Sequence, residues 1–145
     1  DDIIKKFPID LIQIPVNIFN HDFLENDILK KLKRKKIEIH ARSILLQGAL
    51  LENGKVDNSI LIKLRPFVKK LISGLKKKKI SVLRASILFV DQFKEIDVGI
   101  FGVLSKKELK EIILGHSRKL KNLSFLNNFS VNDKIKNSVN WKKIS

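Results

Sequence analysis

The chain of 145 residues contains no cysteine, methionine or tyrosine, and only three prolines and six glycines. Without cysteine it offers no disulfide framework, no thiolate ligands for zinc and no cysteine nucleophile. No apolar run approaches the roughly 20 residues that cross a bilayer, and no signal peptide is visible. We therefore expect a cytoplasmic protein without a membrane partner. Hydrophobic residues make up 43% of the sequence, enough for one packed domain, which excludes disorder as the main state.

Negative charge is scarce, because 30 lysines and arginines face 15 acidic residues and give a net charge of +15. Such a balance points to nucleic acid or another anionic surface. Abundant lysine, isoleucine and asparagine are also typical of an AT-rich genome. The basic clusters at 30–36 and 76–79 lack the interleaved aromatic residues that stack single-stranded bases. We interpret both clusters as solvated faces.

Hydrophobic periodicity divides the chain into alternating strands and helices. Short, β-branched apolar segments predict strands at 9–14, 37–45 and 96–103. Apolar residues at helical spacing predict helices at 22–36, 59–75, 81–90 and 105–113. We expect Pro66 to split the second of these into two helices and Gly115 to end the last. Residues 122–145 are interpreted as an irregular, docked tail.

The strand and helix alternation predicts an α/β fold in which parallel strands are joined by right-handed crossover helices. Alternate residues of a strand share a face, and Gln13, Arg42 and Gly102 fall near the strand ends. We expect these three residues to lie at one rim of the sheet. Ligands gather at the carboxyl ends of parallel strands, so this rim is the candidate binding site.

The segment after the third strand carries the most specific local signal. Ser105 and Glu108 have capping-box spacing, and Gly102 just before them would let the backbone approach a phosphate bound at the helix start. The same residues could do no more than cap a helix. His40 has only Glu38 nearby on its strand face, which favours a satisfied core histidine over a metal ligand.

Three segments resemble, in order and spacing, the C-terminal half of an aldo/keto reductase. Residues 8–17 are similar to the family's sixth barrel strand, residues 39–48 to the seventh strand and its loop, and residues 102–109 to the eighth strand and the phosphate-binding helix start. The resemblance implies that residues 1–121 form the last three β/α units of a TIM-type (α/β)8 barrel. It also implies an oxidoreductase that transfers a hydride between NADP, with NAD as the alternative, and a small-molecule carbonyl substrate.

The resemblance further implies cofactor contacts at nine positions, which are Gln13, Arg42, Ser43, Leu45, Gln47, Gly102, Ser105, Lys106 and Glu108. Gln13 matches the residue that binds the nicotinamide carboxamide, and Arg42 stands where an aromatic ring usually stacks on nicotinamide. Ser43, Leu45 and Gln47 match the loop over the pyrophosphate.

Gly102 and Ser105 match the family's adenosine-phosphate site. Glu108 departs from the family pattern, since its carboxylate would repel a 2′-phosphate where relatives place arginine or glutamine. Lys106 or Lys107 could compensate for that charge.

The catalytic Asp, Tyr, Lys and His of the family belong to its N-terminal half, and this chain contains no tyrosine. We therefore expect no catalytic residue and no metal site within these 145 residues, and no reductase turnover by them alone. This interpretation predicts no nucleic-acid partner. The alternative is a small basic α/β module that binds nucleic acid, and it would show a steep loss of affinity with salt.

Overall fold

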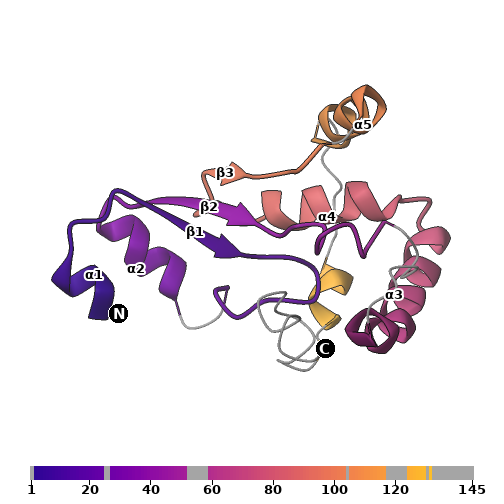
Figure 1. Cartoon of the computed structure of the whole chain (residues 1–145), viewed down its shortest axis with the longest axis horizontal. Helices are drawn as coiled ribbons and strands as arrows, with labels where there is room; N and C mark the ends of the chain where they lie inside the picture. Colours follow the sequence, from indigo (N-terminus) through magenta and orange to yellow (C-terminus); the bar gives the residue numbers. More distant parts are fainter. Residues whose placement is uncertain are drawn as a thin grey trace.

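The computed structural model describes residues 2–24, 27–51, 59–103, 105–116, 124–129 and 131. A parallel three-stranded sheet with strand order β1-β2-β3 lies at its centre (Figure 1). The strands are β1 (Leu11–Pro15), β2 (Glu38–Arg42) and β3 (Val98–Gly99). The predicted α/β class, with parallel strands in sequential order and helices between them, is confirmed.

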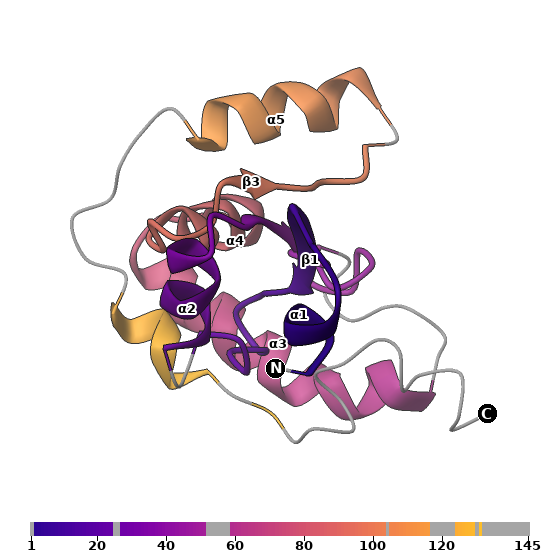
Figure 2. The same ribbon diagram turned by 90° about the vertical axis from the view of Figure 1, so that its left-hand side faces the viewer.

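Helices pack beside the sheet and on one another. They are α1 (Asp2–Lys6), α2 (Ile28–Arg34), α3 (Ser59–Lys77), α4 (Val82–Asp91), α5 (Lys106–His116) and the short 3-10 helix η1 (Ser124–Asn128). α2 packs against β2 and α4 touches β3, while α3 and α5 both contact α4 (Figures 1 and 2). Among the residues that the structure describes, no helix combines the length and apolar character that crossing a membrane requires.

The sheet has one buried face and one uncovered face. Ile14, Ile39 and Ala41 are at most 1% exposed and point into the core. The register places Gln13 beside His40 and Pro15 beside Arg42, so these four residues share the opposite face. Leu11 on the same face is 41% exposed. Within the described residues, the helices therefore cover only one side of the sheet.

The predicted third strand at 96–103 is wrong in length, because β3 contains only Val98 and Gly99. Its partner strand also ends earlier than the predicted residue 45. Ser43 has a φ of 57°, a left-handed conformation that turns the chain away from β2. The last contact between the two strands is the Ile100 N–H, which donates to the Ala41 carbonyl at 2.8 Å. Beyond it, residues 101–103 pair with no strand in the part of the chain that the structure describes.

The predicted helix break at Pro66 is also wrong. Pro66 lies inside the single helix α3, whose inner side chains Leu64, Val68 and Leu71 are fully buried. Burial of this apolar face offsets the roughly 3 kcal/mol that an interior proline costs a helix. The described part of α5 ends at His116, one residue after the predicted stop at Gly115, and Gly115 itself packs against Ile87 of α4.

The first predicted helix, at 22–36, is observed only as α2 at Ile28–Arg34. At the other end of the chain, Leu126 and Val131 are buried, and the Phe129 ring meets Phe19 edge-on with centroids 6.3 Å apart. The remainder of the predicted tail at 122–145 lies outside the described residues.

Candidate functional site

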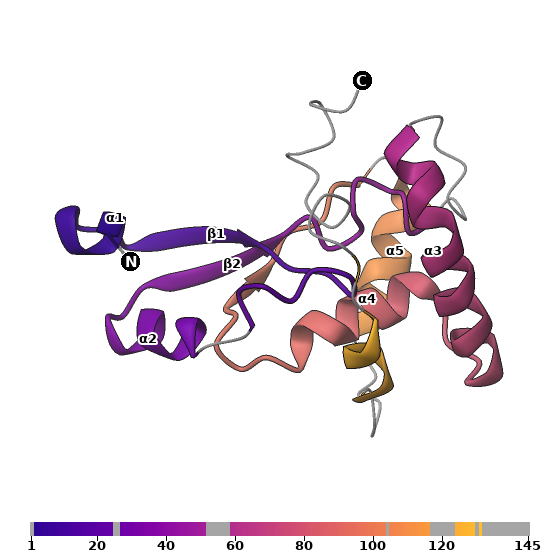
Figure 3. The same cartoon turned by 90° about the horizontal axis from the view of Figure 1, so that it is seen from below.

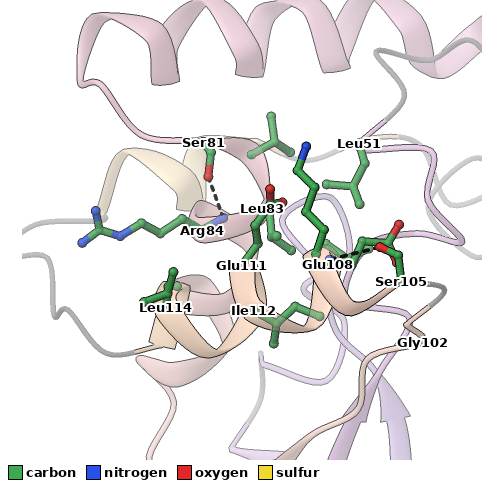
Figure 4. A pocket seen from close by; sticks show the side chains of 14 residues that line it. Leu51, Ser81, Leu83, Arg84, Gly102, Ser105, Glu108, Glu111, Ile112 and Leu114 are labelled. Atoms are coloured by element: carbon green, nitrogen blue, oxygen red, sulfur yellow. Dashed lines mark hydrogen bonds between the residues drawn. The ribbon is translucent and has the colours of Figure 1, made fainter.

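A cavity of about 940 Å³ opens between α4, α5 and the segment after β2 (Figure 4). Its lining comprises Leu45, Leu51, Ser81, Val82, Leu83, Arg84, Gly102, Ser105, Lys107, Glu108, Glu111, Ile112, Leu114 and Gly115. The segments that follow β2 and β3 both contribute to it, so the cavity lies beyond the carboxyl ends of parallel strands. This is where α/β sheets bind their ligands.

The first turn of α5 forms one end of this cavity. Ser105 Oγ accepts a hydrogen bond from the Glu108 N–H at 3.1 Å, which confirms Ser105 as the helix cap. A Cβ built at Gly102 would meet no atom within 4 Å, so the backbone there is open to a ligand. Free N–H groups and the helix dipole make such a turn attractive to anions.

The first turn of α4 forms the opposite end (Figure 4). The backbone at Ser81 is extended, and its Oγ accepts from the Arg84 N–H at 3.2 Å, as the predicted cap requires. The cavity thus receives the N-terminal turns of two helices. Arg84 and Lys107 add positive charge to the lining, whereas Glu108 and Glu111 add negative charge. The arrangement suits a ligand that carries both an anionic group and hydrogen-bond donors.

Left-handed backbone conformations concentrate in the loop that follows β2. Ser43, Leu46 and Gln47 have φ values of 57°, 51° and 54°, which are uncommon for residues other than glycine. Two contacts hold the start of this loop: Arg42 Nη1 donates to Ser43 Oγ at 3.2 Å, and the side-chain amide of Asn17 donates to the Ser43 carbonyl at 3.3 Å. The loop is therefore tied both to its own strand and to the end of β1.

The structure brings four of the nine predicted cofactor residues to one cavity, namely Leu45, Gly102, Ser105 and Glu108. Gln13 and Arg42 lie instead on the uncovered face of the sheet. Ser43, Gln47 and Lys106 are not part of the lining, although Lys106 directly precedes the lining residue Lys107. The cofactor roles of all nine stay predictions.

Sequence reasoning missed the contribution of α4 to this cavity. Ser81, Leu83 and Arg84 line it, yet they lie more than fifteen residues before the recognised segment at 102–109. The cap at Ser81 was a visible signal for a helix start, but nothing in the sequence indicates that the two helix starts meet. The place of Glu111 in the cavity lining could have been predicted from the sequence, since Glu111 lies three residues after Glu108 on the same side of α5.

Asp97 fixes the position of the strand that leads into this cavity. Lys33 Nζ lies 2.8 Å from both carboxylate oxygens of Asp97, and the Ile39 N–H donates to Oδ2 at 2.8 Å. The hydrogen bond from Lys33, followed by that from Ile39, lowers the pKa of the Asp97 carboxyl below its usual value of 3.8. The carboxylate thereby joins α2, β2 and β3.

His40 is half-buried on the uncovered face of the sheet, with Nε2 2.7 Å from Glu38 Oε1. The imidazole therefore has a carboxylate as its hydrogen-bond partner. The prediction that His40 lies in the core is wrong. Among the described residues no group of histidines and carboxylates could hold a metal ion.

Comparison of the chain with models of protein families, with curated proteins and with solved structures found no match.

Proposed function

We propose that this chain forms the dinucleotide-binding part of an oxidoreductase of the aldo/keto reductase type. One observation carries the proposal: Leu45, Gly102, Ser105 and Glu108, drawn from two separate recognised segments, line a single cavity. Its volume of about 940 Å³ is at the upper end of the range for cofactor pockets. NADP is the proposed cofactor and NAD its alternative, and a small carbonyl compound is the substrate.

The proposed architecture is the last three β/α units of a TIM-type barrel. Parallel strands in sequential order, with helices on one face of the sheet, support it. In such a barrel the uncovered face with Gln13, His40 and Arg42 would point to the barrel interior. The planar amide of Gln13 and the guanidinium of Arg42 would then lie beside the nicotinamide.

When bound, the nicotinamide cofactor supplies the hydride for carbonyl reduction. The residues of this chain would hold and orient it. The N–H groups at the starts of α4 and α5 would bind phosphate oxygens, and Gly102 would allow close approach of the backbone. Lys107 would neutralise phosphate charge beside Glu108.

The test compares two charge reversals at adjacent positions. Lys107 lines the cavity and Lys106 does not, although both are exposed on α5. We expect Lys107→Glu to weaken NADPH binding by at least about tenfold, the equivalent of roughly 1.4 kcal/mol. Lys106→Glu, with the same change in net charge, should alter it much less.

Calorimetric or fluorescence titration with NADPH and with NADH measures both effects. The effect of Lys107→Glu should be larger for NADPH, which alone carries the 2′-phosphate. Equal losses in the two variants would show that the lysines act through bulk charge, and an absence of binding to the parent chain would refute the proposed cofactor site.

A further inference from the structure

Helix α3 presents a strongly basic surface that the cofactor cavity does not use. The sequence has nine basic and no acidic residues between Asp57 and Asp91, and most of these bases lie on or just after α3. The helix lies at the edge of the molecule, with α4 on its inner side (Figure 3). This concentration of one charge sign goes beyond the average lysine content of the chain.

The exposed lysines of α3 form two rows. Lys63, Lys70 and Lys77 recur every seven residues, as do Lys69 and Lys76, and all five are exposed. Seven residues are close to two helical turns, so each set runs nearly parallel to the helix axis, and adjacent rows are about 100° apart. The strip between the rows contains the uncharged residues Pro66 and Ser73.

These lysines pair with no acidic residue in the described ranges. In the described part of the chain, none of the five takes part in an ion pair. Lys69 and Lys76 flank a surface hollow of about 390 Å³ that Ile72 and Ser73 also line. The charge of the rows is therefore available to an external anion.

The geometry of the rows distinguishes between two kinds of polyanion. An amphipathic helix binds a membrane by inserting a continuous apolar face, but the apolar face of α3 is buried in the protein's own core. The two large apolar side chains exposed on its described part, Ile62 and Phe67, lie about 140° apart around the helix and form no such face. A helix about 10–12 Å wide does fit the major groove of B-form DNA, which is about 12 Å wide. Two lysine rows on its flanks would then face the phosphates of the two strands.

We propose that the outer face of α3 docks in the major groove of double-stranded DNA and binds its phosphate backbone without reading the base sequence. Lys63, Lys70 and Lys77 contact one strand, and Lys69 and Lys76 contact the other. This proposal does not depend on the proposed cofactor site, since the cavity shares no residue with these rows.

Fluorescence anisotropy with a short labelled DNA duplex tests it. Five phosphate contacts predict a slope of about −4.5 in a plot of log affinity against log salt, or roughly 500-fold weaker binding at 200 mM than at 50 mM salt. Changing all five lysines to glutamine should remove most of that slope. The Lys63/Lys70/Lys77 triple variant and the Lys69/Lys76 double variant should each remove a share in proportion to the lysines lost.

The matched control changes five other exposed lysines to glutamine, namely Lys5, Lys6, Lys31, Lys35 and Lys94. It lowers the net charge by the same amount and should retain nearly the whole slope. Equal losses in the two five-site variants would overturn the proposal in favour of bulk charge. Equal binding of duplex RNA, whose deep and narrow major groove excludes a helix, or stronger binding to anionic lipid vesicles, would overturn it as well.

Discussion

The Asp97 carboxylate helps to hold β3, a strand too short to be held by its own pairing with β2. The β3 strand makes few ladder contacts, so the bonds from Lys33 and from the Ile39 backbone to Asp97 supply much of what fixes it. The side chain of Asp97 is one-third exposed, and solvent screening reduces the worth of its ion pair. The bond to the Ile39 N–H is the more sheltered of the two.

Replacing Asp97 should therefore destabilise the fold in a pH-dependent way. We expect Asp97→Ala to cost about 1–2 kcal/mol near pH 7, and Asp97→Asn less, because its amide oxygen can still accept from Ile39. The carboxylate's contribution is fully present above the ordinary pKa of 3.8 and is lost as the pH falls through the lowered pKa of the folded state. Urea unfolding at several pH values measures this. A deficit in Asp97→Ala that stays constant down to about pH 2 would contradict the assignment.

Single residues were also where prediction from sequence was least complete. The caps at Ser81 and Ser105 follow from local chemistry and were found. The role of Asp97 could not be found, because its partners are 58 and 64 residues away in the chain. Ser43 was expected in a strand, since its left-handed conformation depends on tertiary contacts and not on its intrinsic preference.

At the scale of elements, α4 and α5 approach each other closely at Gly115. A Cβ at this position would lie 2.7 Å from Ile87 Cδ1 and 3.9 Å from Arg84 Cα. The absence of a side chain thus allows α5 to lie against α4 and shapes one wall of the cavity. A glycine that looks like a helix stop in the sequence is explained by this packing.

A double-mutant cycle tests the contact. Gly115→Ala alone should be near neutral, because the gain of about 1 kcal/mol in helix propensity is offset by the clash with Ile87. Ile87→Val removes the clashing methyl group and should cost about 1 kcal/mol by itself. Together the two changes should be coupled favourably by at least about 0.5 kcal/mol in thermal or urea unfolding. Strictly additive effects would show that the helices do not meet at this point.

The elements were predicted better in kind and order than in extent. Periodicity found the three strands and the helices between them, since buried faces repeat regularly along the sequence. It overestimated the strand at 96–103, whose Val98, Ile100 and Val103 are more than a third exposed although they look like core residues. It also divided α3 at Pro66, because a local rule for proline carries no information about how strongly the rest of the helix is packed.

At the scale of the whole molecule, the described residues leave one face of the sheet open, and the chain contains no tyrosine, which is the proton donor that the resemblance to aldo/keto reductases implies. We expect the 145-residue chain to bind NADPH without oxidising it in the presence of aldehydes, because hydride transfer needs a partner acid and the chain has no tyrosine. Absorbance of the reduced nicotinamide over time measures this. Turnover by the purified chain that is lost in the Lys107→Glu variant would show that catalytic residues are present here after all.

The two-residue length of β3 has a consequence for the order in which the molecule assembles. The hydrogen bond between Ile39 and Asp97, which holds β3 on β2, closes a loop of 58 residues. The hydrogen bond between Asn17 and Ser43 closes a loop of only 26 residues. Closing the longer loop costs about 0.7 kcal/mol more in chain entropy. A two-residue strand makes few hydrogen bonds that could offset this entropic cost. The pair β1–β2 with α2 should form early in folding, and β3 should join last and detach first. Since β3 leads into α5, each such detachment would also open the cavity between α5 and α4.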